Sequence, residues 1–91
     1  MREIDRTTRF KRDYKRERKT DSLLDELLIP LIEMLAADDK LPPHLRDHSL
    51  GGEWKGYRDC HVKPDLVLIY GKEPKDVLTL VRLGSHSELF G

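Results

Sequence analysis

The fold is decided by residues 54–83, WKGYRDCHVKPDLVLIYGKEPKDVLTLVRL. Three runs rich in aliphatic, aromatic and β-branched side chains lie in this stretch, and such runs are typical of strands. They extend from Trp54 to Val62, from Leu66 to Tyr70 and from Val77 to Leu83. Only Lys63-Pro64-Asp65 and residues 71–76 separate them. Connections this short favour neighbouring antiparallel strands, so the stretch predicts a meander.

Strand direction in a meander places the end of the first run, the start of the second and the end of the third at one edge of the sheet. The residues at or just beyond these three points are His61, Asp65, Arg82 and His86. We therefore expect these side chains to converge. His48 precedes the first run and can join them only if its loop folds back to the same edge.

The N-terminal part predicts a short strand over residues 4–8 and then a helix to about Lys19, capped by Thr7 or Thr8. Phe10 and Tyr14 mark its narrow inner face. Its basic residues form one arc of about 180° that excludes Asp13 and Glu17: Arg9, Lys11, Arg12, Lys15, Arg16, Arg18 and Lys19. An ordinary solvated face would mix both signs, so we interpret this arc as a phosphate-binding surface, with the solvated face as the alternative.

A second helix is predicted over residues 22–37, capped by Thr20, Asp21 or Ser22. It is expected to be the chief core helix, with one apolar stripe and three residues that widen it: Leu24, Leu28, Leu31 and Leu35, then Leu23, Leu27 and Ile32. Pro30 lacks an amide hydrogen, so we expect a kink or break there. Residues 38–52 contain two prolines and two glycines and predict a long irregular connection.

Length and composition indicate one domain over residues 1–91, with a formal net charge of zero. That zero is a cancellation: residues 1–19 hold nine basic and four acidic side chains, and residues 21–39 hold six acidic and no basic ones. The single Cys60 cannot form an intramolecular disulfide, and we interpret it as a strand residue rather than a reactive thiol. No apolar run is long enough to span a membrane, so we expect a cytoplasmic, soluble protein.

The histidines and Arg82 match the needs of RNA cleavage without a metal. Imidazoles can take a proton from the 2′-hydroxyl and give one to the 5′-oxygen, and a guanidinium can stabilise the pentacoordinate phosphorus. Asp65 could act as a base or could orient an imidazole. Isolated surface histidines are one alternative, and a zinc site is another: His44, His48, Cys60 and His61. No CxxC or HExxH pattern supports zinc, so we expect neither metal nor cofactor.

Two long motifs, DHSLGGEWKGYRDCHVKPD from Asp47 to Asp65 and RLGSHSELFG from Arg82 to Gly91, closely resemble the YafQ type of toxin in the RelE/ParE superfamily. The resemblance implies an α+β, RelE-like fold of order β-α-α-β-β-β. In it, two N-terminal helices pack on an antiparallel sheet, and a short helical turn ends the chain. Such toxins cut messenger RNA in the ribosomal A site and are held inactive by a cognate antitoxin, here expected to be DinJ-like with a ribbon-helix-helix fold.

Carried over position by position, the functional residues of the family fall on His48, His61, Asp65 and His86, with Phe90 as the C-terminal aromatic. Arg82 stands where related toxins keep a phosphate-contacting arginine. The resemblance favours His86 as general acid and leaves the base open. Phe90 could stack on a base or close the core. Ribosomal RNA then becomes the expected partner of six basic residues: Arg9, Lys11, Arg12, Lys15, Arg16 and Lys19.

The sequence therefore predicts a monomeric, metal-independent, ribosome-dependent endoribonuclease. Two alternatives remain. One is a toxin of the same fold that poisons gyrase and cuts no RNA. The other is an inactive binding module that acts only together with an antitoxin. Exact codon preference and the stoichiometry of the complex do not follow from these residues.

Overall fold

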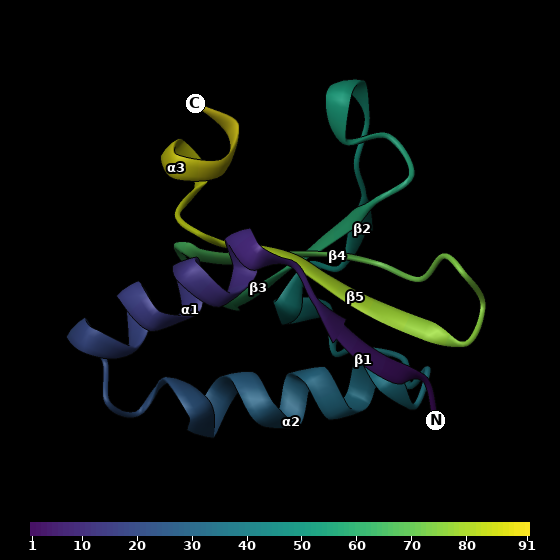
Figure 1. Ribbon diagram of the computed structural model, residues 1–91, viewed down its shortest axis with the longest axis horizontal. Coiled ribbons are helices and arrows are strands. Elements are labelled where there is room, and N and C mark those ends of the chain that lie inside the picture. The colour runs from purple at the N-terminus through teal and green to yellow at the C-terminus, as the bar shows by residue number, and fades with distance from the viewer.

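The computed structural model describes all of residues 1–91. Its elements in chain order are β1 (Glu3–Arg6), α1 (Thr8–Thr20), α2 (Leu24–Ala36), the 3-10 turn η1 (Pro43–Leu45), β2 (His48–Ser49), the 3-10 turn η2 (Gly52–Trp54), β3 (Arg58–Lys63), β4 (Leu66–Gly71), β5 (Val77–Gly84) and α3 (His86–Phe90). The fold is α+β, with two N-terminal helices and one sheet, as expected. In Figure 1, α2 lies on one side of the sheet, and α3 and the segment after β2 rise on the other.

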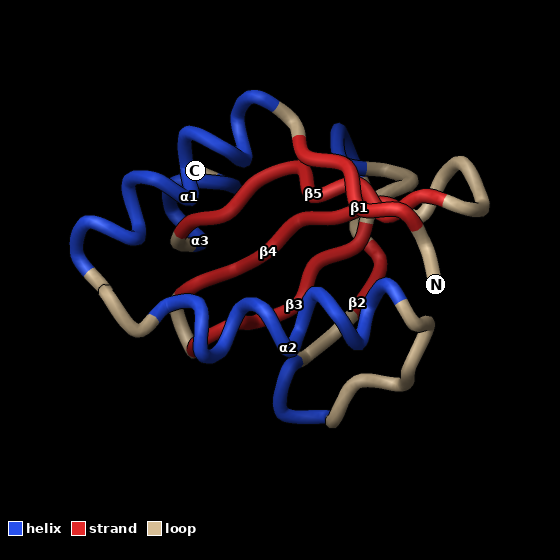
Figure 2. The backbone as a smooth tube through the Cα atoms, turned by 60° about the horizontal axis from the view of Figure 1, so that its bottom comes forward, coloured by secondary structure: helices blue, strands red, loops and turns tan.

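The five strands form one sheet in the order β1-β5-β4-β3-β2. The predicted meander of β3, β4 and β5 is antiparallel, and β2 adds antiparallel to β3. The prediction of a wholly antiparallel sheet was wrong, because β1 pairs with β5 in parallel, with Glu3 opposite Val77. The chain leaves β1 through both helices before it returns, and a connection of that length permits a parallel neighbour. Figure 2 shows β1 beside β5.

Helix α1 begins as predicted at the Thr7 cap, whose hydroxyl oxygen accepts a hydrogen bond from the Phe10 amide at 3.0 Å. The same hydroxyl donates to the carbonyl of Val81 at 2.7 Å, and the Thr7 amide donates to the carbonyl of Leu80 at 3.1 Å. Phe10 is buried. The start of α1 therefore pairs with the outer edge of β5 beyond the end of β1. Without this contact, backbone groups of β5 would be unpaired.

Helix α2 buries the predicted stripe, but two of the three residues expected to widen it face outward. Ile32 is buried, whereas Leu23 and Leu27 are 61% and 50% exposed. No side chain caps the helix; the nearest candidate is Asp21, whose carboxylate accepts from the Leu23 amide at 3.0 Å just before the first turn. The helix continues through Pro30 without a break, so the cost there is one missing backbone hydrogen bond.

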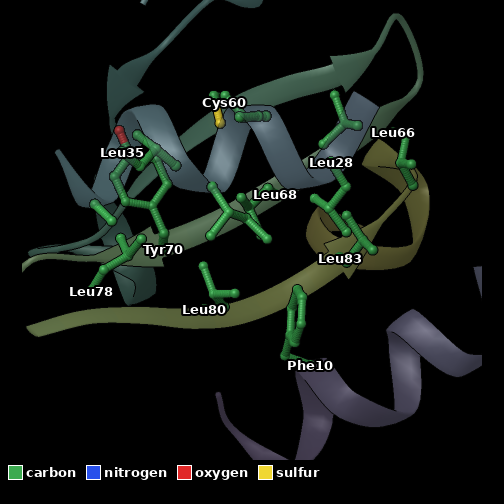
Figure 3. Packing of buried hydrophobic residues seen from close by; sticks show 14 of the residues in the cluster. Phe10, Leu28, Leu35, Cys60, Leu66, Leu68, Tyr70, Leu78, Leu80 and Leu83 are labelled. Carbon is green, nitrogen blue, oxygen red and sulfur yellow. The ribbon is translucent and has the colours of Figure 1, made fainter. Parts of the chain in front are cut away.

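The main core lies between α2, α1 and the sheet, and Figure 3 shows its residues close together. Leu28 and Leu35 of α2 meet Leu68 and Tyr70 of β4 in this cluster, with Phe10 entering from α1. A smaller cluster on the opposite face contains Val67, Ile69 and Leu89. Apolar side chains on both faces explain why every residue of β4 is buried.

The segment predicted as a long irregular connection is partly ordered, and the first predicted run begins later than expected. Residues 38–52 contain η1 and the two-residue strand β2. Strand β3 starts at Arg58 rather than at Trp54, which belongs to η2. Gly56 has a φ of 95° in the turn between them, a conformation that a residue with a Cβ rarely adopts. None of the helices has the length and apolar character required to span a bilayer.

Candidate active site

The site lies on the face of the sheet opposite α2. Alternation along β3 directs Cys60 and Val62 into the main core and leaves Asp59 and His61 on the other face. The strand register aligns His48 of β2 with Asp59, Asp59 with Ile69, and Ile69 with Arg82. One row across four strands therefore contains a histidine, a carboxylate and an arginine, and His61 occupies the next row.

His61, His86 and Phe90 form a continuous set of rings. The ring centroids of His61 and His86 are 5.3 Å apart, and those of His86 and Phe90 are 5.6 Å apart. His61 is 8% exposed, whereas His86 and Phe90 face outward. Nδ1 of His61 lies 3.3 Å from the carbonyl oxygen of Pro64. A carbonyl can only accept, so Nδ1 carries the hydrogen and Nε2 of the neutral ring keeps the lone pair.

Asp65 contacts the backbone amide of His86 rather than an imidazole ring. Its carboxylate accepts a hydrogen bond from the His86 amide at 3.4 Å, at the first residue of α3. Ser85 and Glu88 close a capping box at the same end, which fixes where the helix begins. Asp65 thereby helps to hold His86 in position beside His61, and its carboxylate remains exposed.

His48 reaches the site because β2 pairs with β3. Its Nδ1 lies 2.8 Å from the carbonyl oxygen of Arg46 and 3.0 Å from Oδ1 of Asp59. The neighbouring Asp47 accepts hydrogen bonds from the Tyr70 hydroxyl and from Nε of Arg58, which ties the loop before β2 to the sheet. Burial and, after it, the hydrogen bond to Asp47 raise the pKa of Tyr70, so its hydroxyl stays a donor.

Asp59 is a residue that the sequence reasoning missed. It is 1% exposed, and burial raises its pKa, although the nearby histidines favour its charged form. Its place two residues before His61 in a strand was the available signal, because residues i and i+2 share a face. Its burial depends on β2, which the sequence did not reveal as a strand.

Arg82 lies in the expected region, but another residue holds it. Its Nε and Nη2 donate to the two carboxylate oxygens of Asp13 at 2.8 and 3.1 Å, and its side chain is 15% exposed. Asp13, which the sequence reasoning only placed outside the basic arc, is 3% exposed. Burial alone would raise its pKa, but the hydrogen bonds from Arg82 and from the Leu83 amide lower it below the usual value.

Two residues of the basic arc of α1 interact with the rest of the fold. Arg18 is half-buried and lies 3.6 Å from Asp25, and Arg16 makes several contacts although it is exposed. Arg16 donates to Asp13 at 3.2 Å and to the carbonyl oxygen of Leu83 at 3.1 Å, and it lies 3.6 Å from Glu88. Arg16 therefore stabilises the packing of α1 on β5 and α3. The other five predicted residues are exposed and form no salt bridge: Arg9, Lys11, Arg12, Lys15 and Lys19.

The side chains considered for zinc do not come together. Cys60 faces the main core, on the opposite side of β3 from His61, and burial raises the pKa of its thiol to about 12. No group of three or more histidine, cysteine, aspartate or glutamate side chains is arranged to hold a metal ion. The chemistry available on this face is proton transfer by three imidazoles and interaction of cations with phosphate.

Comparison with known proteins matches residues 2–91 to a family described as the bacterial toxin of type II toxin-antitoxin systems, YafQ. The mRNA interferase toxin YafQ of Escherichia coli K12 is 37% identical over 91 residues, covering 100% of this chain and 98% of that protein. A putative toxin YafQ of Haemophilus influenzae is 43% identical over 75 residues, covering 79% of this chain and 74% of that protein.

Solved structures agree with this match. The Escherichia coli DinJ-YafQ complex aligns with a TM-score of 0.88 at 37% identity, covering 100% of both chains. A copper-bound mutant toxin from Helicobacter pylori aligns with a TM-score of 0.93 at 39% identity, covering 99% of this chain and 100% of that one. Both alignments therefore include α1, α2 and the whole sheet.

Proposed function

Because the chain belongs to the YafQ family of bacterial toxins from type II toxin-antitoxin systems, we propose that it is an mRNA interferase that cuts translated messenger RNA in the ribosomal A site. The observation that carries this proposal is the contact between His61 and His86, whose ring centroids are 5.3 Å apart. Two imidazoles held side by side, with His86 exposed, suit general acid–base cleavage of a phosphodiester.

In the proposed reaction the ribose 2′-oxygen attacks the adjacent phosphorus while its proton passes to a base. The bond between phosphorus and the 5′-oxygen breaks, and the 5′-oxygen takes a proton from His86. The products are a 2′,3′-cyclic phosphate and a 5′-hydroxyl, so one proton leaves and one arrives. The unprotonated Nε2 of His48, the same atom of His61 and the carboxylate of Asp65 are the candidates for the base. Each proton transfer contributes about 10²- to 10⁴-fold to the rate.

Cations complete the proposed site. Arg82 uses Nε and Nη2 on Asp13, which leaves Nη1 to interact with a phosphate oxygen. The exposed face of α1, which contains Lys11, Arg12 and Lys15, is proposed to contact ribosomal RNA, because one codon is too short to occupy it. Phe90, 40% exposed beside His86, is proposed to stack on a base of the message.

A cognate antitoxin is the proposed protein partner, as in the Escherichia coli DinJ-YafQ complex. The exposed apolar side chains of α2 support this proposal. Leu27 and Ile29 of α2 are 50% and 47% exposed, and Leu23 at its N-cap is 61% exposed, so apolar side chains of this helix are available for contact with a partner.

Mapping cleavage on a translated message tests the proposal. Wild-type protein should cut within the reading frame only when the message is translated. Toxin that has been stripped of metal by a chelator, and freed of the chelator before it meets the ribosomes, should cut equally well. His86→Ala should lower the rate by about 10²-fold or more, because the leaving oxygen loses its proton donor. His44→Ala is the control, since His44 is exposed on η1 and has no proposed role.

Three results would contradict the proposal or one of its parts. Intact messages accompanied by DNA damage after induction would indicate a gyrase poison. Unchanged cleavage by His86→Ala would remove His86 as the general acid. Loss of cleavage by toxin that was treated with a chelator beforehand, restored by returning a metal to the toxin, would show that the metal-independent part of the mechanism is wrong.

A further inference from the structure

Asp59 is a buried carboxylate to which the proposed reaction assigns no task. Its side chain is 2% exposed, and its Oδ1 has no aligned hydrogen-bond partner. In the sheet it lies between Ile69 of β4, which is fully buried, and the short strand β2. A charged oxygen in such surroundings destabilises a fold unless opposite charge or hydrogen bonds compensate it, so its presence calls for a cause.

The groups able to compensate Asp59 are histidines. His48 faces it from β2, His61 follows it in β3, and His86 approaches from α3, while the acidic Asp47 acts in the opposite direction. Arg82 lies in the same row of the sheet, but Asp13 already binds its guanidinium. A permanent positive charge is therefore not what balances Asp59.

His48 is held between two oxygen atoms on one side of its ring. Nδ1 is 2.8 Å from the carbonyl oxygen of Arg46 and 3.0 Å from Oδ1 of Asp59, and both oxygens are acceptors. Nδ1 must then carry hydrogen, and the lone pair of the neutral ring is on Nε2. The aligned hydrogen bond goes to Arg46, so Asp59 acts on the ring mainly through its charge.

We infer that Asp59 is a positioning residue for His48. The carboxylate of Asp59 keeps the imidazole of His48 in the Nδ1–H form and stabilises the positive ring that arises when Nε2 accepts a proton. This inference rests on the proposed function and gives His48 the role of proton acceptor. Asp59 touches no substrate atom in this arrangement. Asp59 lowers the stability of the fold while it assists the reaction, because its carboxylate is buried without a hydrogen bond to Oδ1.

The first test does not depend on activity. Ring-nitrogen chemical shifts of His48 in the wild-type chain should show mainly the Nδ1–H form. In Asp59→Asn the ratio of the Nδ1–H to the Nε2–H form should fall by about tenfold, because the charge that favours a donor at Nδ1 is gone. An unchanged ratio would overturn the inference even if the chain proved not to cleave RNA, and the expected change would support it in that case too.

Stability separates this role from a purely structural one. Asp59→Asn should raise the unfolding temperature by about 4 °C or leave it unchanged, since it removes a buried charge that lacks an aligned partner. A residue kept for the fold would give the opposite result, a drop of several degrees. Asp38→Asn is the matched control, because it makes the same substitution away from the site. Asp38 pairs with Arg2 and Lys72 rather than with a histidine.

The second test uses single-turnover cleavage of a translated message. Asp59→Asn should slow cleavage by about 10²-fold with little change in the concentration that gives half the maximal rate, and Asp38→Asn should leave the rate unchanged. In a His48→Ala background, Asp59→Asn should have almost no further effect, because it acts through His48. An equal loss in both backgrounds would overturn the inference while leaving the proposed nuclease intact. No cleavage by the wild-type chain would contradict the nuclease and leave the spectroscopic test to decide.

Discussion

Replacement of Asp13 by asparagine should destabilise the fold more than any other change of one carboxylate to an amide. The carboxylate of Asp13 receives four hydrogen bonds: from Nε of Arg82 at 2.8 Å, Nη2 of Arg82 at 3.1 Å, the Leu83 amide at 3.0 Å and Nη1 of Arg16 at 3.2 Å. An asparagine oxygen can accept some of these, but its amide nitrogen would face donors. The Arg82 guanidinium would then be buried without a counter-ion.

The expected loss follows from that arrangement. Removing one partner of a buried ion pair costs about 3–5 kcal/mol, and a retained acceptor oxygen places Asp13→Asn near ~3 kcal/mol. For a chain of this size, that corresponds to a fall in unfolding temperature of about 12–24 °C. Thermal unfolding followed by circular dichroism at pH 7 measures it. Asp21→Asn serves as control, because its ion pair with Lys63 is exposed to solvent and should contribute little to stability.

The pH dependence gives a second check with a defined sign. The folded-state pKa of Asp13 is lowered, so its contribution to stability is present above its unfolded pKa of about 3.9 and is lost as pH falls through the lower folded value. The difference in stability between wild type and Asp13→Asn should therefore shrink below about pH 4. A difference of less than about 1 kcal/mol at pH 7, or one that grows in acid, would refute the assignment of Asp13 as the counter-ion of Arg82.

Four further outcomes are expected. Cys60, whose thiol has a pKa raised by burial to about 12, should react with an alkylating reagent at pH 8 only after unfolding, as mass spectrometry would show. Lys11→Glu combined with Lys15→Glu should weaken ribosome binding and reduce its salt dependence without changing the unfolding temperature, as measured by sedimentation at several salt concentrations. Phe90→Ala should slow single-turnover cleavage by about tenfold while Phe90→Tyr retains it, because a base gains about 1–3 kcal/mol from stacking on an aromatic ring. Leu68→Ala should cost about 2–5 kcal/mol in urea unfolding, since Leu68 is fully buried in the main core.

The meander could be predicted from the sequence because its connections are short and its strands are rich in β-branched and aliphatic residues. The parallel pairing of β1 could not be predicted, since its partner Val77 lies far away in the chain and four residues hold little pattern. Leu23 and Leu27 flank the apolar stripe of α2 and are nevertheless exposed, although Leu24 and Leu28 beside them are buried. The apolar pattern does not tell how wide a face of the helix the sheet covers.

The arrangement of the candidate site could likewise be predicted only in part. Strand direction brought His61 and His86 together, as predicted. Arg82 depends on a register shift in the pairing of β4 and β5, where Ile69 faces Arg82 but Tyr70 faces Leu80. Without that bulge, alternation from Leu80 would direct Arg82 into the core. A hydrophobic pattern does not reveal a single extra residue. It does not reveal the role of Asp13 either, because Arg82 and Leu83, which bind it, lie at the far end of the chain.

The parallel pairing of β1 with β5 has a consequence for the protein while it is being synthesised. Glu3 lies opposite Val77, so the sheet cannot close until β5 has been made, and long-range pairing of this kind slows folding. His86 and Phe90 follow β5 directly. A chain released early therefore has neither a closed sheet nor the pair of histidines, and an incomplete product of translation should be harmless to the cell that makes it.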